Sequence, residues 1–191
     1  RIPRIALVDF NNDSVRDSLR VLDAMFAKYR ELMDAGYHEE AEKYKLYGVR
    51  LDTSGSLRDV SVQPLGEPAL DLGVNPRLVF NVRQGLDNAW ESWNVPTSWK
   101  DAAREYCHSV KIVVSGGFNP DKIRKFERLE VPVDIYAVGS YLFNNSNGTS
   151  TDYTADVVRA SVAGALVAVV ASAGARLIAA AVAHWIEAVA G

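Results

Sequence analysis

The sequence has little cysteine, no strong excess of either charge and no long hydrophobic run. Its single cysteine, Cys107, excludes an intrachain disulfide and fits a reducing cytoplasm. The net charge of -3 and the pI near 5.6 argue against a nucleic-acid-binding surface, which usually carries clustered positive charge. The first ten residues contain only a short apolar run, so we expect no secretory signal and a cytoplasmic location.

The most apolar part of the chain is residues 160–191, which contain 13 alanines and two charged residues, Arg176 and Glu187. The uncharged stretch between Arg159 and Arg176 has 16 residues, short of the ~18 that indicate a spanning helix. A membrane span is therefore not expected. Gly174 divides the segment into two pieces of helical length, which predicts a helical hairpin that packs on a sheet or on another subunit. A composition so dominated by Ala and Val is also typical of a designed or grafted segment.

Residues 1–159 alternate between short apolar runs and amphipathic helical patterns. The runs predict buried strands at 5–9, 46–52, 110–115 and 133–138, and the patterns predict helices at 14–36, 75–93, 101–109 and 120–130. Residues 61–76 are rich in Pro and Gly and predict a long loop. Strand–helix–strand alternation favours parallel pairing, so we expect an α/β fold in which residues 1–159 form half of a TIM-like barrel.

Glycines follow two of the predicted strands. Ser115-Gly116-Gly117 ends the third strand, and Gly139-Ser140 ends the fourth. A phosphate oxygen must come within ~3 Å of backbone N–H groups, and glycine removes the Cβ that would obstruct it. The following helix start, Asn119-Pro120-Asp121, would add a partial positive charge. The pattern predicts a phosphate site at the carboxyl ends of the strands; the simpler alternative is that these glycines make tight turns.

Arg50 and Asp52 lie two positions apart in the second predicted strand and therefore point to the same face. The planar guanidinium of Arg50 suits a substrate carboxylate, and Asp52 suits sugar hydroxyls or a metal. The alternative is a structural ion pair at the mouth of the barrel.

Four segments in order, GVRLDTSGSLRD, KIVVSGGFNPDKIRKFE, VDIYAVGS and TDYTADVV, resemble the C-terminal half of nicotinate phosphoribosyltransferases over residues 4–159. The resemblance implies condensation of nicotinate with phosphoribosyl pyrophosphate to nicotinate mononucleotide, with Mg²⁺ and ATP. It further implies roles for eight residues. Arg50 and Asp52 would face nicotinate and ribose, Ser115, Gly116, Gly117, Gly139 and Ser140 would hold the phosphate, and Asp9 would be a further ribose- or metal-facing carboxylate.

The chain also departs from that family. The family's phosphorylated histidine lies upstream of the matching region, and His38, His108 and His184 do not replace it. Tyr141 places a bulky ring where the family has a small residue. We therefore expect a phosphoribosyltransferase-derived domain that is inactive alone. The alternatives are an engineered scaffold without catalysis and an isolated phosphate- or nucleotide-binding module. Exposed sheet edges favour a homo-oligomer or a complementary chain as partner.

Overall fold

The computed structural model describes residues 2–139, 141, 154–159 and 168–172, the last two segments as backbone only. The chain divides into two units, residues 1–138 and 139–191. The first unit contains the four-stranded sheet and the helices that position six of the eight predicted site residues.

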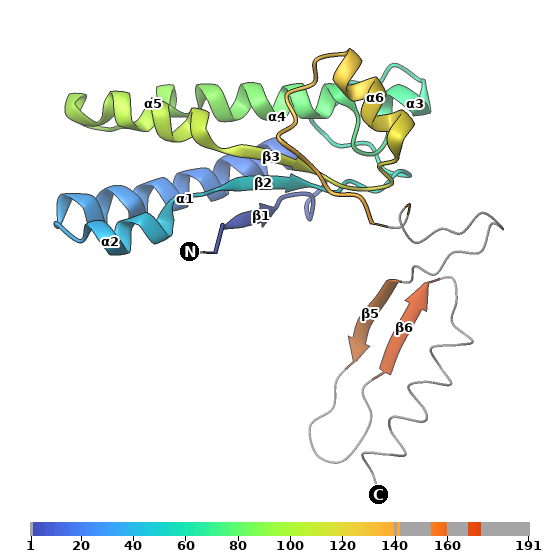
Figure 1. Cartoon of the computed structure of the whole chain (residues 1–191), viewed down its shortest axis with the longest axis horizontal. Coiled ribbons are helices and arrows are strands. Elements are labelled where there is room, and N and C mark those ends of the chain that lie inside the picture. The colour runs from blue at the N-terminus through green and yellow to red at the C-terminus, as the bar shows by residue number, and fades with distance from the viewer. Residues whose placement is uncertain (1, 140, 142–153, 160–167, 173–191) are drawn as a thin grey trace, which may run out of the picture. The chain divides into compact units, whose positions relative to one another are not determined.

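The first unit is built on a four-stranded parallel sheet in the order β1-β2-β3-β4 (Figure 1). The strands are β1 (Ile5–Leu7), β2 (Gly48–Leu51), β3 (Lys111–Val114) and β4 (Ile135–Tyr136). In register, Leu7 lies beside Arg50, Arg50 beside Val113, and Val113 beside Ile135. Because neighbouring strands run parallel, the carboxyl ends of all four strands lie on the same side of the sheet, which we call the carboxyl edge.

Helical segments connect the strands. They are α1 (Ser14–Asp34), α2 (His38–Ala41), η1 (Glu42–Tyr44), α3 (Pro68–Asp71), α4 (Pro76–Asn88), η2 (Ala89–Ser92), η3 (Thr97–Trp99), α5 (Lys100–Ser109) and α6 (Pro120–Arg128). Side-chain caps fix the starts of three of them. Asp13, Asn75 and Asn119 each accept a hydrogen bond from the backbone N–H three residues later.

The core lies between one face of the sheet and the helices. Val49, Leu51, Ile112 and Val114 come from alternate positions of β2 and β3 and are fully buried. They share a cluster with buried helix residues from α1, α4, α5 and α6. In Figure 1, α4 and α5 follow one another along the sheet. The period-2 alternation leaves the opposite positions, which include Ile5, Leu7 and Arg50, on a face that these helices do not cover.

The predicted α/β class is confirmed at the level of a mixed fold with a four-stranded parallel sheet. Each predicted strand exists but is shorter than expected. The predicted helix at 75–93 ends at Asn88 and continues as the 3-10 turn η2, and the predicted loop at 61–76 contains the short helix α3. Asn75 and Pro76 occupy the expected cap and first-turn positions.

One prediction for the C-terminal segment is wrong where the structure describes it. Residues 168–172, expected in a helix, form β6 (Ala168–Ser172), which pairs antiparallel with β5 (Thr154–Arg159). Adjacent valines at 169 and 170 favour extended backbone, and β5 supplies the hydrogen bonds. The rest of the predicted hairpin lies outside the described residues. Within the described part of the chain, no helix is both long and apolar enough to span a bilayer.

Candidate functional site at the carboxyl edge of the sheet

Six of the eight predicted site residues lie at the carboxyl edge. Asp9 follows β1, Arg50 lies in β2 and Asp52 directly follows that strand, and Ser115, Gly116 and Gly117 follow β3. The hydrogen bonding between the chains of β2 and β3 continues past the end of β3, since Ser115 N donates to the Leu51 carbonyl at 2.9 Å. The three elements therefore present these residues side by side.

Arg50 is the centre of a polar network that links two strands. Its Nε donates to Ser115 Oγ at 2.9 Å, and its terminal NH2 group donates to Asp52 Oδ2 at 2.8 Å. Ser115 is buried, and its hydroxyl also donates to the Leu51 carbonyl at 3.2 Å. The guanidinium is thus held in a fixed orientation at the edge of the sheet, with 45% of its side chain still exposed. This is the arrangement expected of an anion-binding group, although a structural ion pair would also produce it.

The two glycines after β3 adopt backbone conformations that favour glycine. Gly116 has φ of +88° and Gly117 has φ of +68°. A Cβ at Gly116 would lie 3.3 Å from Asp52 Oδ1, so the backbone here approaches the carboxylate closely. A Cβ at Gly117 would meet nothing within 4 Å, so this position is open. Gly116 is therefore required by both its conformation and its surroundings, whereas Gly117 is required by its conformation alone.

Asp9 is electrostatically strained. Its Oδ1 is buried and has no hydrogen-bond partner in the described part of the chain. Burial is the largest cause that raises the pKa of Asp9 above its usual value; the negative charge of Asp52 raises it further, and Arg50 opposes the rise. A buried carboxylate oxygen without a donor is expected at a site whose ligand supplies the missing hydrogen bond or charge.

We expect Asp9→Asn to stabilise the chain at pH 7. Because the pKa of Asp9 is higher in the folded state, folding favours the neutral carboxyl over the charged carboxylate. This contribution to stability is complete below the unfolded pKa near 3.8 and is lost as the pH rises through the folded pKa. Removing the charge should raise Tm at pH 7 by no more than about 2 °C, because Asp9 is partly exposed and solvent screens its charge. Calorimetric melting from pH 3 to pH 8 measures the effect.

The gain from Asp9→Asn should disappear below pH 3.8, where the wild-type carboxyl is protonated in both states. Asp23→Asn on α1 is the control, since it also removes one negative charge. An equal gain in Tm at pH 3 and pH 8 would show that the folded structure does not disfavour the charged form of Asp9.

Lys122 is a candidate that sequence reasoning missed. It lies in the first turn of α6, and its Nζ reaches back to donate to the Gly116 carbonyl at 3.1 Å. The ammonium lies 4.2 Å from the centroid of the Phe118 ring. Burial, followed by the charge of Lys125, lowers the pKa of Lys122. A lysine three residues after a helix cap, close behind a glycine pair, was the available signal in the sequence.

The structure does not place the two remaining predicted residues relative to this group. Gly139 is the first residue of the second unit, and Ser140 lies outside the described residues. Convergence of two glycine-tipped strands on one pocket therefore stays a prediction. The histidines at 38 and 108 lie in α2 and α5, away from the carboxyl edge, and His184 is outside the described residues.

The carboxylates at this edge suit one mode of Mg²⁺ binding. Within residues 2–139 and 141, no cluster of three or more His, Cys, Asp or Glu side chains could hold a metal ion. Mg²⁺ is, however, commonly held by one or two carboxylates together with substrate phosphates. Asp9, with its unpartnered oxygen, and the neighbouring Asp52 fit that mode. A bound Mg²⁺ would neutralise phosphate charge; nothing in the described residues identifies an ATP site.

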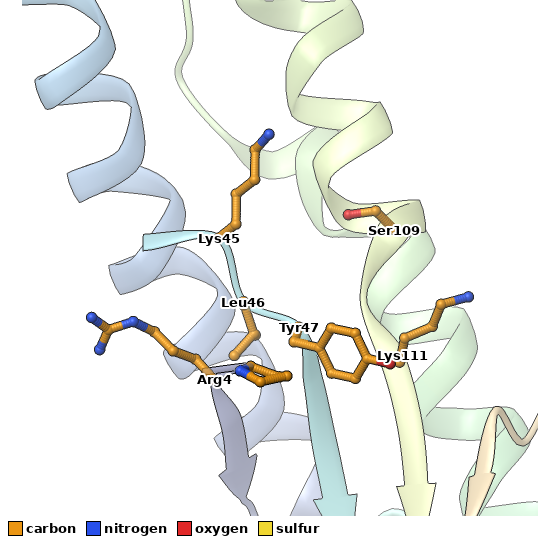
Figure 2. A pocket seen from close by; sticks show the side chains of 7 residues that line it. Arg4, Lys45, Leu46, Tyr47, Ser109 and Lys111 are labelled. Carbon is orange, nitrogen blue, oxygen red and sulfur yellow. The ribbon is translucent and has the colours of Figure 1, made fainter. Parts of the chain in front are cut away.

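A separate pocket of about 310 Å³ lies at the opposite, amino edge of the sheet. Figure 2 shows Arg4, Lys45, Tyr47 and Lys111 around it. Its cations already have partners: Lys45 pairs with a carboxylate, Lys111 pairs with Asp134 at 2.8 Å, and Arg4 lies over the Tyr44 ring. The pocket is therefore a weaker candidate for an anion than the carboxyl edge.

No protein-family model, curated protein or solved structure matches this chain. The geometry at the carboxyl edge and the resemblance of the four sequence segments therefore support an inference about function without help from a known relative.

Proposed function

We propose that this chain binds a phosphorylated ribosyl ligand, of the class of nicotinate mononucleotide or phosphoribosyl pyrophosphate, at the carboxyl edge of its parallel sheet. The single observation that carries the proposal is the Arg50–Ser115–Asp52 network beside Gly116, which contacts Asp52 closely, and the open backbone of Gly117. The network combines an oriented cation and a carboxylate with an unobstructed peptide group at Gly117.

Each part of the ligand has a suitable group in this arrangement. The exposed backbone at Gly117, followed by the capped start of α6, suits the phosphate. Asp9 and Asp52 suit ribose hydroxyls, which would donate to the carboxylate oxygens. Arg50 suits the carboxylate of a nicotinate ring through its planar fork. We further propose that the four strands form half of a barrel, so that turnover requires residues from outside this half.

The proposal predicts that Arg50→Gln weakens binding without unfolding the chain. The Arg50–Asp52 pair is partly exposed, and such pairs contribute less than about 1 kcal/mol to stability. We therefore expect Tm to change by no more than about 3 °C, while the Kd for nicotinate mononucleotide rises at least about tenfold, the usual loss for a charged hydrogen bond. Isothermal titration calorimetry and thermal melting measure the two effects.

The matched control is Arg20→Gln, which removes an exposed arginine from α1 and should leave Kd unchanged. Titrations with ribose 5-phosphate and with nicotinate then separate the contributions of the two parts of the ligand. Equal affinity of wild type and Arg50→Gln for all three compounds would refute the assigned role of Arg50. No heat of binding for any of them would refute the proposed function.

A further inference from the structure

Lys122 occupies a position that is unfavourable for a cation. It lies in the first turn of α6, where the aligned peptide dipoles create a partial positive charge that favours acidic residues. Its ammonium is also partly removed from water and lies near the positive charge of Lys125, and these two effects lower the pKa of Lys122. A lysine that is disfavoured in these ways needs local interactions to hold its charge in place.

Two contacts hold the ammonium of Lys122. Its Nζ lies 4.2 Å from the centroid of the buried Phe118 ring, and this cation–π contact partly replaces the lost hydration. Phe118 is fixed in turn by edge-to-face packing against buried Phe126, with the ring centroids 5.0 Å apart. The same Nζ donates to the Gly116 carbonyl at 3.1 Å, and this oxygen has no other donor among the described residues. The core of the protein therefore directs Lys122 to the glycine turn.

The contact with the Gly116 carbonyl determines where the next amide points. The Gly116 carbonyl and the Gly117 N–H belong to one planar trans peptide, so the two groups point in opposite directions. While Lys122 holds the oxygen, the N–H points away from the ammonium, and no group in the described part of the chain accepts it. Without this restraint the peptide between two glycines would rotate easily, because neither residue has a Cβ to limit its backbone.

We propose that Lys122 is a positioning residue, which orients the Gly116–Gly117 peptide for the phosphate of the ligand. The inference rests on the proposed function, and it assigns Lys122 no contact with the phosphate itself. The hydrogen bond from Lys122 keeps the Gly117 N–H directed toward the anion and keeps the Gly116 carbonyl, which would repel an anion, turned away from it. Such preorganisation strengthens binding, because the ligand does not have to order the turn.

Lys122→Met tests this role, because it keeps an apolar side chain of similar length beside Phe118 and removes the ammonium. We expect the Kd for nicotinate mononucleotide to rise about fivefold or more, and Lys122→Arg, which still carries donors, to bind within about twofold of the wild type. The Tm of Lys122→Met should fall by no more than about 2 °C, because the variant also removes a desolvated charge from the positive end of a helix. Calorimetry and thermal melting measure these effects.

The matched control is Arg128→Gln, which removes a cation from the last turn of α6 and should bind the mononucleotide with the wild-type Kd. Nicotinate riboside, which lacks the phosphate, should bind the wild type and Lys122→Met equally well. The NMR carbon resonance of the Gly116 carbonyl reports on the hydrogen bond from Lys122. We expect it to shift in ligand-free Lys122→Met and to shift far less when the wild type binds the mononucleotide.

Three results would contradict the role of Lys122 while leaving the proposed function intact. They are a wild-type Kd in Lys122→Met, an equal loss of affinity in Lys122→Arg, and a Gly116 carbonyl resonance that moves to the Lys122→Met value when the wild type binds ligand. The last result would show that Lys122 leaves the carbonyl to contact the phosphate directly. A wild-type chain that gives no heat of binding would instead refute the proposed function, and this inference with it.

Discussion

Gly48→Ala should destabilise the chain by about 3 kcal/mol, the upper end of the range for overpacking a buried site. An added Cβ would lie 2.8 Å from the Lys111 carbonyl oxygen and 3.2 Å from the Lys111 Cβ. The first of these atoms is backbone of the neighbouring strand, held by the β2–β3 pairing, so it cannot move without loosening the centre of the sheet. Urea unfolding followed by circular dichroism measures the loss as a lower midpoint.

The control for this substitution is Gly55→Ala. An added Cβ at Gly55 would meet nothing within 4 Å, so the substitution should change the unfolding free energy by less than about 0.5 kcal/mol. Equal midpoints for Gly48→Ala and Gly55→Ala would mean that β2 and β3 are not as close as the structure has them.

Gly116→Val should abolish binding of nicotinate mononucleotide. Valine is strained at a φ of +88°, and its Cβ would lie 3.3 Å from Asp52 Oδ1, which forces the carboxylate or the loop to move. We expect no measurable heat of binding in calorimetry and a stability loss of about 1–2 kcal/mol from the left-handed backbone. The folded core should survive, because Gly116 follows β3 instead of lying within it.

Gly55→Val provides the comparison for binding, since Gly55 has open space around it and no positive φ. It should bind the mononucleotide with the wild-type Kd. If Gly116→Val also binds with the wild-type Kd, the glycine after β3 serves only the turn, and the simpler interpretation of the two glycines is correct.

The strand pattern was predictable because each strand is a short apolar run bounded by polar or glycine residues. The apolar runs correctly predicted four strands that pair in parallel, but the predicted strands were longer at their ends than the observed ones. At the end of β2, for example, Asp52 lies outside the ladder, where its carboxylate accepts from Arg50. Strand ends depend on which backbone groups find partners, and composition alone does not specify this.

The candidate site was partly predictable for a similar reason. Period-2 spacing placed Arg50 and Asp52 together, and the position of Ser115 after β3 placed it at the same edge. Two features depend on tertiary packing and were not foreseen. These are the unpartnered oxygen of Asp9, which arises from burial, and the return of Lys122 to the Gly116 carbonyl.

The C-terminal segment shows the limit of composition as a predictor of secondary structure. Alanine-rich sequence of helical length predicts a helix, yet residues 168–172 are a strand paired with residues 154–159. Alanine favours helices by only a few tenths of a kcal/mol per residue over most other residues, so a partner strand outweighs it easily. Local propensity cannot anticipate such a partner.

The most direct test of the ligand site is NMR mapping of backbone amides while nicotinate mononucleotide is added to the wild-type chain. We predict that the largest shifts fall on the amides of Gly116, Gly117 and the first turn of α6, with smaller shifts at Asp9 and Asp52. Shifts confined to the amino-edge pocket around Tyr47, or a spectrum that does not change at saturating ligand, would contradict the account.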